Sequence, residues 1–307
     1  MKHVDVIRDF DPWKGPLCTC PPKYSFQPYT GCSHGCLYCY ATSYIRAKNA
    51  RPKKDLIKRL LHDLRRIDPH RPINMSTSSD PYTPEERKYM LTRKALKILV
   101  PMGFRILITT KGIIVMRDID IISGGNVAVM ITITTLRRDI ARKMEPNAPS
   151  PEKRIEAVRI LNESGIPVGV RIDPVIPLIN DDPNELVELV DEVVDAGAQH
   201  IVTSTYKAKP DSLKRISTVF PEIGTKLRRM YDAEEKYGGY RYLPRDRRRR
   251  ILDPVIKRAI ERKVTIATCR EGFYFGAPSC DGTHLIPNKI KVKSQQLYVK
   301  TLVDYVR

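Results

Sequence analysis

The sequence contains no apolar run long enough to span a membrane, and we expect no secretory leader. Residues 1–14 are charged and lack the apolar stretch that a signal peptide requires. We therefore expect a cytoplasmic protein that acts away from membranes. Disulfides are rare in that reducing compartment, so the seven cysteines are expected to bind metal rather than to pair with one another.

Acidic residues are few relative to basic ones. The chain has 54 lysines and arginines against 35 aspartates and glutamates, which gives a formal net charge of +19. A thermophile-type surface of ion pairs would carry matching acids, and this chain does not. The surplus positive charge favours a polyanionic partner, and we expect a nucleic acid, either RNA or DNA.

Three cysteines, Cys32, Cys36 and Cys39, lie close together at the spacing C-x3-C-x2-C. Clustered thiolates hold iron–sulfur clusters or zinc. A structural zinc site usually has four ligands arranged in C-x2-C pairs, which makes zinc the lesser alternative here. Three ligands for a cluster of four irons would leave one iron open to a substrate or cofactor.

This motif, with Tyr38 just before its last cysteine, resembles the signature of radical SAM enzymes. In that family the open iron binds the amino and carboxylate groups of S-adenosylmethionine (SAM). Reductive cleavage of SAM gives a 5′-deoxyadenosyl radical, which takes a hydrogen atom from the substrate. The resemblance implies a 4Fe-4S cluster, SAM and an external electron donor.

Strand and helix patterns alternate along the middle of the chain, which predicts an α/β fold with a parallel sheet. We expect a helix to begin with Thr83 as its N-cap and Glu86 closing a capping box. Predicted strands cover residues 25–29, 72–77, 104–109, 127–134, 166–172 and 200–205, and predicted helices cover 55–67, 83–103, 114–122, 150–165 and 182–197.

This rhythm fits a barrel, a partial barrel or a doubly wound sheet, and the family resemblance favours a partial (β/α) barrel of the radical SAM type. We expect three regions: an N-terminal cysteine-containing segment (1–23), the partial barrel (24–206) and a basic C-terminal appendage (207–307) with Cys269 and Cys280.

The predicted strand ends carry motifs that resemble the spore photoproduct lyase-like branch of radical SAM proteins. Ser79-Asp80, Lys111 and Arg171 each follow or end a predicted strand. By position, the resemblance implies that SAM is bound by Tyr38, Ser79, Asp80, Lys111, Thr132 and Arg171. Lys111 would pair with the SAM carboxylate as a point charge.

The same resemblance implies catalytic roles for Tyr38 and Tyr40, which match the tyrosines of a radical relay in that branch. In spore photoproduct lyase, a cysteine two residues before the post-strand Ser-Asp pair returns a hydrogen atom to the product radical. Thr77 stands at the matching position here, and a hydroxyl is a poor hydrogen-atom donor. We therefore expect a reaction other than thymine-dimer reversal.

Four further cysteines fall in predicted loops: Cys18, Cys20, Cys269 and Cys280. Four thiolates close a tetrahedral zinc site or fully ligate an iron–sulfur cluster. We expect these four to converge on a second metal site, with either metal possible. An iron–sulfur cluster is preferred over zinc, because the first site already requires cluster assembly. The alternative is a set of buried, unused thiols.

Residues 237–250 interleave tyrosines with arginines, a composition suited to phosphate contact and base stacking. The alternative is a solvated basic turn before a helix. The predicted nucleic-acid contacts are Arg241, Arg245, Arg247, Arg248, Arg249 and Arg250.

Together these features predict a radical SAM enzyme that acts on RNA or DNA. Two other functions stay open at this point. One is a radical SAM enzyme that modifies a protein or a metabolite. The other is a non-catalytic nucleic-acid-binding protein with structural metal sites.

Overall fold

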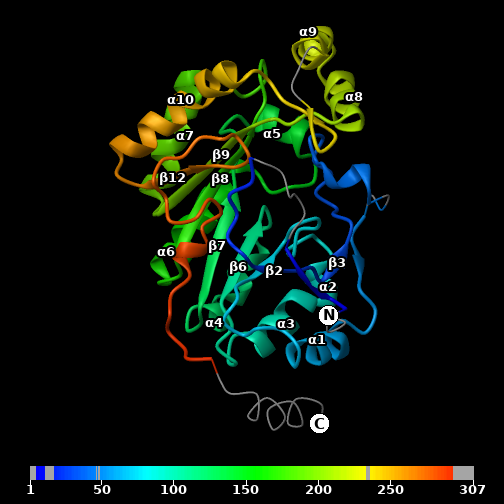
Figure 1. Cartoon of the computed structure of the whole chain (residues 1–307), viewed down its shortest axis with the longest axis vertical. Helices are drawn as coiled ribbons and strands as arrows, with labels where there is room; N and C mark the ends of the chain where they lie inside the picture. The colour runs from blue at the N-terminus through cyan, green and yellow to red at the C-terminus, as the bar shows by residue number, and fades with distance from the viewer. Residues whose placement is uncertain (1–4, 11–16, 46, 48, 233–235, 293–307) are drawn as a thin grey trace.

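The computed structural model describes residues 5–10, 17–45, 47, 49–232 and 236–292. In these residues one large open sheet forms the centre of the molecule (Figure 1). Its eight strands, in the order in which they lie side by side, are β1 (Ile7–Asp9), β2 (Tyr24–Phe26), β5 (Ile73–Met75), β6 (Ile106–Thr110), β7 (Val127–Thr132), β8 (Val168–Val175), β9 (His200–Thr205) and β12 (Thr265–Thr268).

Only β1 runs antiparallel to its neighbour in this sheet, and the other described pairs are parallel. The sheet does not close, because β1 and β12 remain at its two edges. The predicted α/β class and the partial barrel are confirmed.

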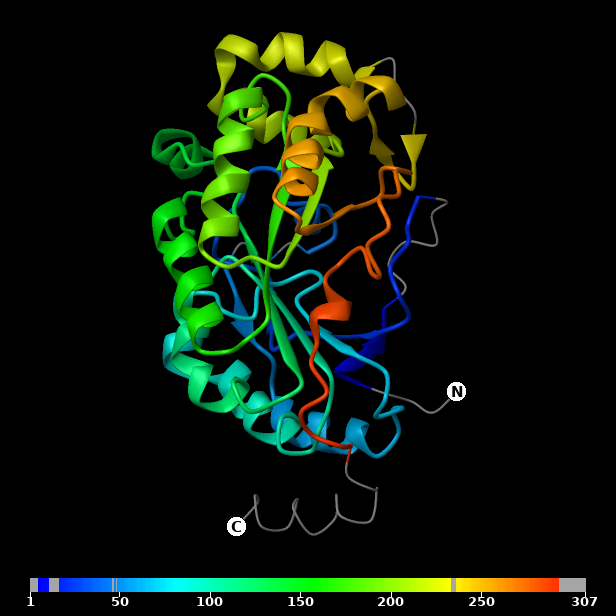
Figure 2. The same cartoon turned by 90° about the vertical axis from the view of Figure 1, so that its left-hand side faces the viewer.

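Helices cover the outer face of the sheet (Figures 1 and 2). Side chains alternate across a strand, so every second residue points outward. Ile106 and Ile108 of β6 and Val127 and Val129 of β7 pack in this outer core. The helices that contribute side chains to the same core are α1 (Leu56–Leu64), α3 (Leu91–Leu99), α4 (Ile119–Ile122), α6 (Pro151–Glu163), α7 (Pro183–Asp195) and α10 (Arg245–Glu261).

The inner face of the sheet is covered by the chain that follows β12. Ile286 and Leu285 of this segment pack over four inward side chains, Leu107, Ala128, Met130 and Val202. This segment, coloured orange to red, runs along the sheet (Figure 2). Beside the amino end of β7, Asn126 Nδ2 donates to the Ile290 carbonyl at 2.7 Å. The inside of the partial barrel is thus filled at this end, and the open space lies near the carboxyl ends of the strands.

The remaining elements surround those strand ends. Helices α8 (Pro210–Val219) and α9 (Pro221–Asp232) form a second apolar core with Leu37 and Tyr38. The short elements are β3 (Tyr29–Thr30), η1 (Ala41–Ser43), β4 (Arg51–Pro52), α2 (Glu86–Tyr89), η2 (Ile113–Asp118), α5 (Arg138–Met144), β10 (Lys236–Tyr237), β11 (Tyr240–Arg241) and η3 (Thr283–Leu285). None of the helices in the described ranges is long and apolar enough to cross a bilayer.

The C-terminal third of the chain takes part in the sheet. β12 pairs in parallel with β9, from Thr265 opposite His200 to Thr268 opposite Thr203. An uncovered β9 would present a row of unpaired backbone groups at the edge, and β12 satisfies them. The boundary predicted at residue 206 therefore does not coincide with an edge of the sheet.

The predicted helix at residues 83–103 is two helices, α2 and α3, separated by Met90 with φ +51°. The predicted capping box is wrong, because Glu86 serves the second helix instead. Its carboxylate accepts the backbone N–H groups of Thr92 and Arg93 at 3.0 and 3.1 Å. A buried carboxylate thus satisfies two free donors in the first turn of α3.

Candidate active site

A cavity of about 280 Å³ lies where the parallel strands end. Its walls include residues of β6, β7, β8 and β9 and the loops that follow β5, β6 and β9, as expected for a site at the carboxyl ends of barrel strands. The same cavity is lined by all seven cysteines of the chain: Cys18, Cys20, Cys32, Cys36, Cys39, Cys269 and Cys280.

Residues 31–40, the cluster loop, carry three of these cysteines between β3 and η1. Gly31 has φ +82°, and a Cβ there would lie 2.8 Å from two backbone carbonyl oxygens, so only glycine fits without strain. Leu37 N–H donates to the Met144 carbonyl at 2.9 Å. Arg215 of α8 donates to the carbonyls of Leu37 and Cys39, both at 3.1 Å. These contacts fix the backbone of the loop on the wall of the cavity.

Asp80 ties the cluster loop to the end of β6. Its buried carboxylate accepts Thr110 Oγ1 at 2.5 Å and the Lys111 N–H at 2.8 Å, and it lies 3.3 Å from His34 Nε2. Burial opposes the charge, but His34 and the hydrogen bonds outweigh it and lower the pKa of Asp80 to about 2. His34 belongs to the cluster motif, but its partner Asp80 could not be predicted from the sequence.

Lys111 presents a positive charge to the cavity. Its Nζ lies 5.4 Å from the centre of the Tyr38 ring and has no hydrogen bond or salt bridge among the described residues. Burial alone would lower the pKa of Lys111, but Cys36 and Glu145 nearby raise it. The side chain is therefore suited to hold the carboxylate of a ligand.

Glu145 and Arg154 form a buried ion pair behind Tyr38. The Tyr38 hydroxyl donates to Glu145, and Arg154 Nη1 donates to the Thr132 carbonyl at 2.9 Å. This pair joins the cluster loop to the end of β7. Sequence reasoning missed both residues, because neither belongs to a recognisable motif.

Arg171 lines the cavity from β8. Its guanidinium pairs with Asp173, and it also interacts with the Cys269 side chain. Asp173 accepts a hydrogen bond from Ser204 at the end of β9. The charge of Arg171 is therefore already paired with a carboxylate, unlike that of Lys111.

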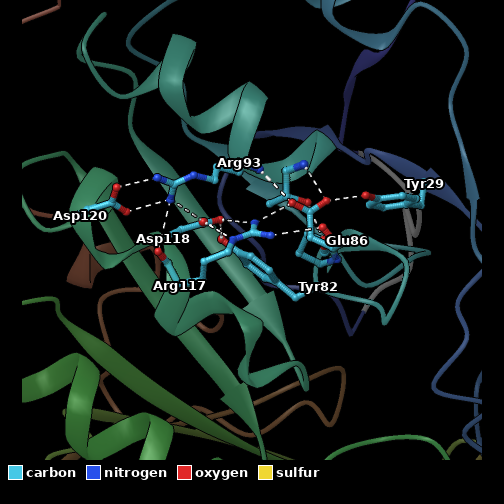
Figure 3. A network of polar contacts seen from close by, with 9 residues as sticks. Tyr29, Tyr82, Glu86, Arg93, Arg117, Asp118 and Asp120 are labelled. Atoms are coloured by element: carbon cyan, nitrogen blue, oxygen red, sulfur yellow. Dashed lines mark hydrogen bonds and ion pairs between the residues drawn. The ribbon is translucent and has the colours of Figure 1, made fainter. Parts of the chain in front are cut away.

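A second polar network lies behind the loops after β5 and β6 (Figure 3). Glu86 and Asp118 are fully buried, and Arg117 binds both of them, at 2.8 and 2.7 Å. Arg93 joins Asp118 to the exposed Asp120 at 2.9 and 2.6 Å. Tyr29 and Tyr82 donate their hydroxyls to Glu86 and Asp118, respectively, and so connect the network to the strand before the cluster loop and to the loop after Asp80.

The family model of the radical SAM superfamily matches residues 26–206, which is more than half of the chain. The chain belongs to the radical SAM superfamily. As a member of it, the chain is a radical SAM enzyme. The family resemblance seen in the sequence and the predicted enzyme class are both confirmed.

Two sequence relatives extend the comparison. An uncharacterized protein of Mycobacterium bovis, Mb2609c, is 25% identical over 230 residues, which cover 69% of this chain and 68% of that protein. A radical SAM Nalpha-GlyT isomerase of Pseudomonas phage M6 is 23% identical over 257 residues, which cover 80% of this chain and 53% of that protein.

Solved structures of spore photoproduct lyase share the fold. One variant of that lyase, with bound AdoMet and dinucleoside spore photoproduct, superposes with a TM-score of 0.65 at 18% identity. The match covers 85% of this chain and 79% of that chain. The predicted architecture of the spore photoproduct lyase-like branch is thereby supported at the level of the fold.

The cavity of this radical SAM enzyme fits the 4Fe-4S cluster and SAM that the family implies. Cys32, Cys36 and Cys39 are thiols of one short loop on one wall, which is the donor set that an open cluster needs. The cavity also holds Asn74 Oδ1, which is buried and has no hydrogen-bond partner among the described residues. When bound, the cluster and SAM supply the 5′-deoxyadenosyl radical.

The six residues predicted to bind SAM all line this cavity: Tyr38, Ser79, Asp80, Lys111, Thr132 and Arg171. Ser79 Oγ donates to the Gly31 carbonyl at 2.6 Å, so it supports the cluster loop. Contacts of these residues with SAM stay predictions. The catalytic roles of Tyr38 and Tyr40 also stay predictions, with the Tyr40 hydroxyl donating to the Thr77 carbonyl.

The arginines predicted to contact nucleic acid are mostly paired with acids. Arg241 binds Asp232, Arg249 binds Asp253 and Arg250 binds Asp246, at 2.6 to 2.8 Å. Arg245 is exposed and stacks 5.3 Å from the Phe273 ring, and Arg247 is half-buried.

For Arg248 the prediction is wrong. Its side chain is 2% exposed, and its guanidinium lies 2.7 Å from the buried Glu271 carboxylate. Arg248 therefore stabilises the fold and presents no charge to a partner.

We expect Lys111→Ala to weaken SAM binding about ten- to hundredfold, because hydrogen bonds to charged groups contribute about 1.5–3 kcal/mol. Titration of the reconstituted protein with SAM measures the change, and its iron content should stay the same because Lys111 is not a thiolate. Lys257→Ala is the matched control, since Lys257 is an exposed lysine of α10. Equal SAM affinity of the two variants would show that Lys111 does not bind the cofactor.

Proposed function

We propose that this radical SAM enzyme acts on a nucleic acid whose phosphates lie in a basic groove beside the cluster loop. The groove has a volume of about 430 Å³. Its residues are Asp5, Arg8, Thr30, Arg51, Pro52, Lys53, Lys54 and Arg59. This local surplus of positive charge is the observation that carries the proposal.

The charges of the groove are not neutralised by the protein. Its single acid, Asp5, is bound by Arg59. The other four cations, Arg8, Arg51, Lys53 and Lys54, make no salt bridge with any described residue. They differ in this from Arg249 and Arg250 of α10, which are paired with acids. Free cations gathered in one groove are what a phosphate backbone requires.

The two short strands that contribute to the groove, β3 and β4, flank the cluster loop along the chain. β3 leads into the cluster loop. β4, which follows the loop and η1 along the chain, pairs with β3, with Thr30 opposite Arg51. A strand held by Arg51 and Lys53 would therefore pass the base of the loop that carries Cys32. This position would present a nucleotide to the cavity.

The comparisons support the same class of substrate. The spore photoproduct lyase structure holds a dinucleoside photoproduct in a fold that this chain shares. Thr77 lines the cavity. By the sequence resemblance it stands where that lyase has its hydrogen-donating cysteine, so we infer a different reaction on the nucleic acid. The reaction also needs an external one-electron donor and a reducing compartment, which suits the cytoplasm.

The test is binding of single-stranded DNA and RNA to the native chain and to Lys53→Met. Each phosphate contact with a single strand contributes about 0.7 to the slope of log affinity against log salt, so we expect the variant's slope to fall by about 0.7. Arg250→Ala is the control, because Arg250 is exposed but paired with Asp246.

The pH dependence gives a second readout of the same variant. Burial and the charges of Arg8 and Arg59 lower the pKa of Lys53 to about 8, against the opposing effect of Asp5. Lys53 is therefore charged below that pH and loses its charge above it. We expect affinity to fall as the pH rises through about 8, and this step should be absent from Lys53→Met.

Two outcomes would contradict the proposal. A loss of salt slope in Arg250→Ala but not in Lys53→Met would assign binding to α10 instead of the groove. Stimulation of SAM cleavage by peptides, with no salt-dependent binding of DNA or RNA, would favour a protein substrate.

A further inference from the structure

The four cysteines outside the cluster loop come from opposite ends of the chain and lie around one side of the cavity. Cys18 and Cys20 precede β2, Cys269 directly follows β12, and Cys280 lies in the next loop. Cys280 is 9% exposed and packs with Cys20, Ala267 and Ala277. The radical SAM cluster does not use these thiols, because it already has Cys32, Cys36 and Cys39.

The sulfur atoms are close enough to share a ligand. Cys20 Sγ and Cys280 Sγ are 3.6 Å apart. A disulfide bond would be about 2.05 Å long. Two sulfurs on one tetrahedral ion, each about 2.3 Å from the metal, lie about 3.8 Å apart. The observed separation, across which the Cys280 thiol donates a hydrogen bond to Cys20 Sγ, is close to that of neighbouring ligands.

The other two thiols extend this pair. Cys18 interacts with Cys20, and Cys269 interacts electrostatically with Cys280. Both Cys18 and Cys269 are half-buried and lie outside regular secondary structure, so rotation of their side chains is not blocked by a helix or strand.

Three cations surround the four thiols. The ammonium of Lys23 is 1% exposed and acts electrostatically on Cys20 and Cys280. The guanidinium of Arg171 interacts with Cys269, and that of Arg270 acts on both Cys18 and Cys269. A divalent ion with four thiolates carries two net negative charges, and buried charge must be compensated nearby. Lys23 and Arg171 each also pair with a carboxylate, that of Asp281 and that of Asp173, respectively.

Within the described ranges, no group of three or more cysteine, histidine or acidic side chains is already arranged to hold a metal. This is equally true of Cys32, Cys36 and Cys39, which form the cluster motif of the family. Binding at either set therefore requires the thiols to draw together. For the second set, Cys18 and Cys269 would have to close on the pair that already stands at 3.6 Å.

We propose that Cys18, Cys20, Cys269 and Cys280 bind one zinc ion in a closed tetrahedral site. Four thiols release their protons and bind the ion as thiolates, with no change of oxidation state. The short Cys20–Cys280 separation favours a single ion over a cluster, in which ligands on different irons stand farther apart. The ion would join residues 17–23 to the segment after β12 and so stabilise that wall of the cavity. This inference does not rest on the nucleic-acid substrate.

The experiment uses the full chain with Cys32, Cys36 and Cys39 replaced by alanine, so that iron at the cluster loop is absent. We expect about one zinc per chain by mass spectrometry of the metals. Adding Cys20→Ala and Cys280→Ala should reduce zinc to background. Replacement of zinc by cobalt(II) in the triple variant should give the sulfur-to-cobalt charge-transfer absorption of a four-thiolate site.

Because removal of Cys20 and Cys280 could unfold the chain, Cys18→Ser in the triple variant is a milder second test. It should keep its circular dichroism spectrum and lose zinc to a chelator at least tenfold faster. Zinc absent from the triple variant, or retained when Cys20 and Cys280 are replaced, would overturn the proposal. Iron and sulfide in place of zinc would overturn the assignment to a single ion.

Discussion

Replacement of Cys32, Cys36 and Cys39 by alanine is expected to remove the iron bound at the cluster loop and to reduce 5′-deoxyadenosine formation to background. Thiolates are the ligands of such a cluster, and alanine offers no donor atom. The nearest alternative ligand in the loop, His34, is held by Asp80 and the Asn147 carbonyl at 3.3 and 3.4 Å. Iron and sulfide analysis after anaerobic reconstitution, followed by a SAM cleavage assay with dithionite, measures both effects.

Ser33→Ala is the matched control for this triple variant. Ser33 lies in the same loop, accepts the Ala50 N–H at 2.9 Å and donates to Glu85. It offers no thiolate, so its loss should perturb the loop slightly and leave the iron content near that of the native chain. Continued cleavage of SAM by the triple variant would refute the assignment of these three cysteines as the cluster ligands.

The cluster loop could be predicted from sequence because its chemistry is local. Three thiols within eight residues carry the signal whatever the rest of the chain does. The strand–helix rhythm is local in the same sense, because a buried parallel strand shows as a short apolar run between turns. The strand predicted at 200–205 matches β9, His200–Thr205, in full.

The partners of the site could not be predicted, because they meet only in the folded sheet. Glu145 lies 107 residues after Tyr38, yet it accepts the hydrogen bond from that side chain. No spacing rule connects residues at such a separation. The same holds for Lys23 and Asp281, which are 258 residues apart and form a buried ion pair.

The arginine run of α10 shows a different limit. Residues 245–250 include five arginines, and from composition alone all of them are expected to be exposed to solvent. In a helix each residue turns by about 100°, so a run of this length necessarily directs one side chain to the core. Arg248 takes that position, and the fold supplies Glu271 to balance its charge.

Loss of the Glu86 carboxylate is expected to destabilise the fold by about 3–5 kcal/mol, the usual cost of breaking a buried ion pair from one side. Glu86→Ala would leave Arg117 without one of its two carboxylates, the Tyr29 hydroxyl without its acceptor and two N–H groups of α3 unpaired. Urea unfolding of the metal-free protein measures the change without a contribution from the cluster. Figure 3 shows Glu86 between Tyr29, which lies on the strand before the cluster loop, and Arg117. Loss of this carboxylate should loosen the cluster loop, so the SAM affinity of the folded fraction should fall as well.

Asp120→Ala is the control that separates burial from charge pairing. Asp120 also binds an arginine of this network, at 2.6 Å, but its side chain is 59% exposed. Exposed ion pairs contribute about 0.2–1 kcal/mol, so we expect a small shift in the urea midpoint. Arg93 would keep Asp118 at 2.9 Å, and the loops that carry Asp80 and Lys111 would stay joined. Equal destabilisation by the two variants would show that the network stabilises the protein through its surface charges, and that the buried carboxylates do not hold the two loops together.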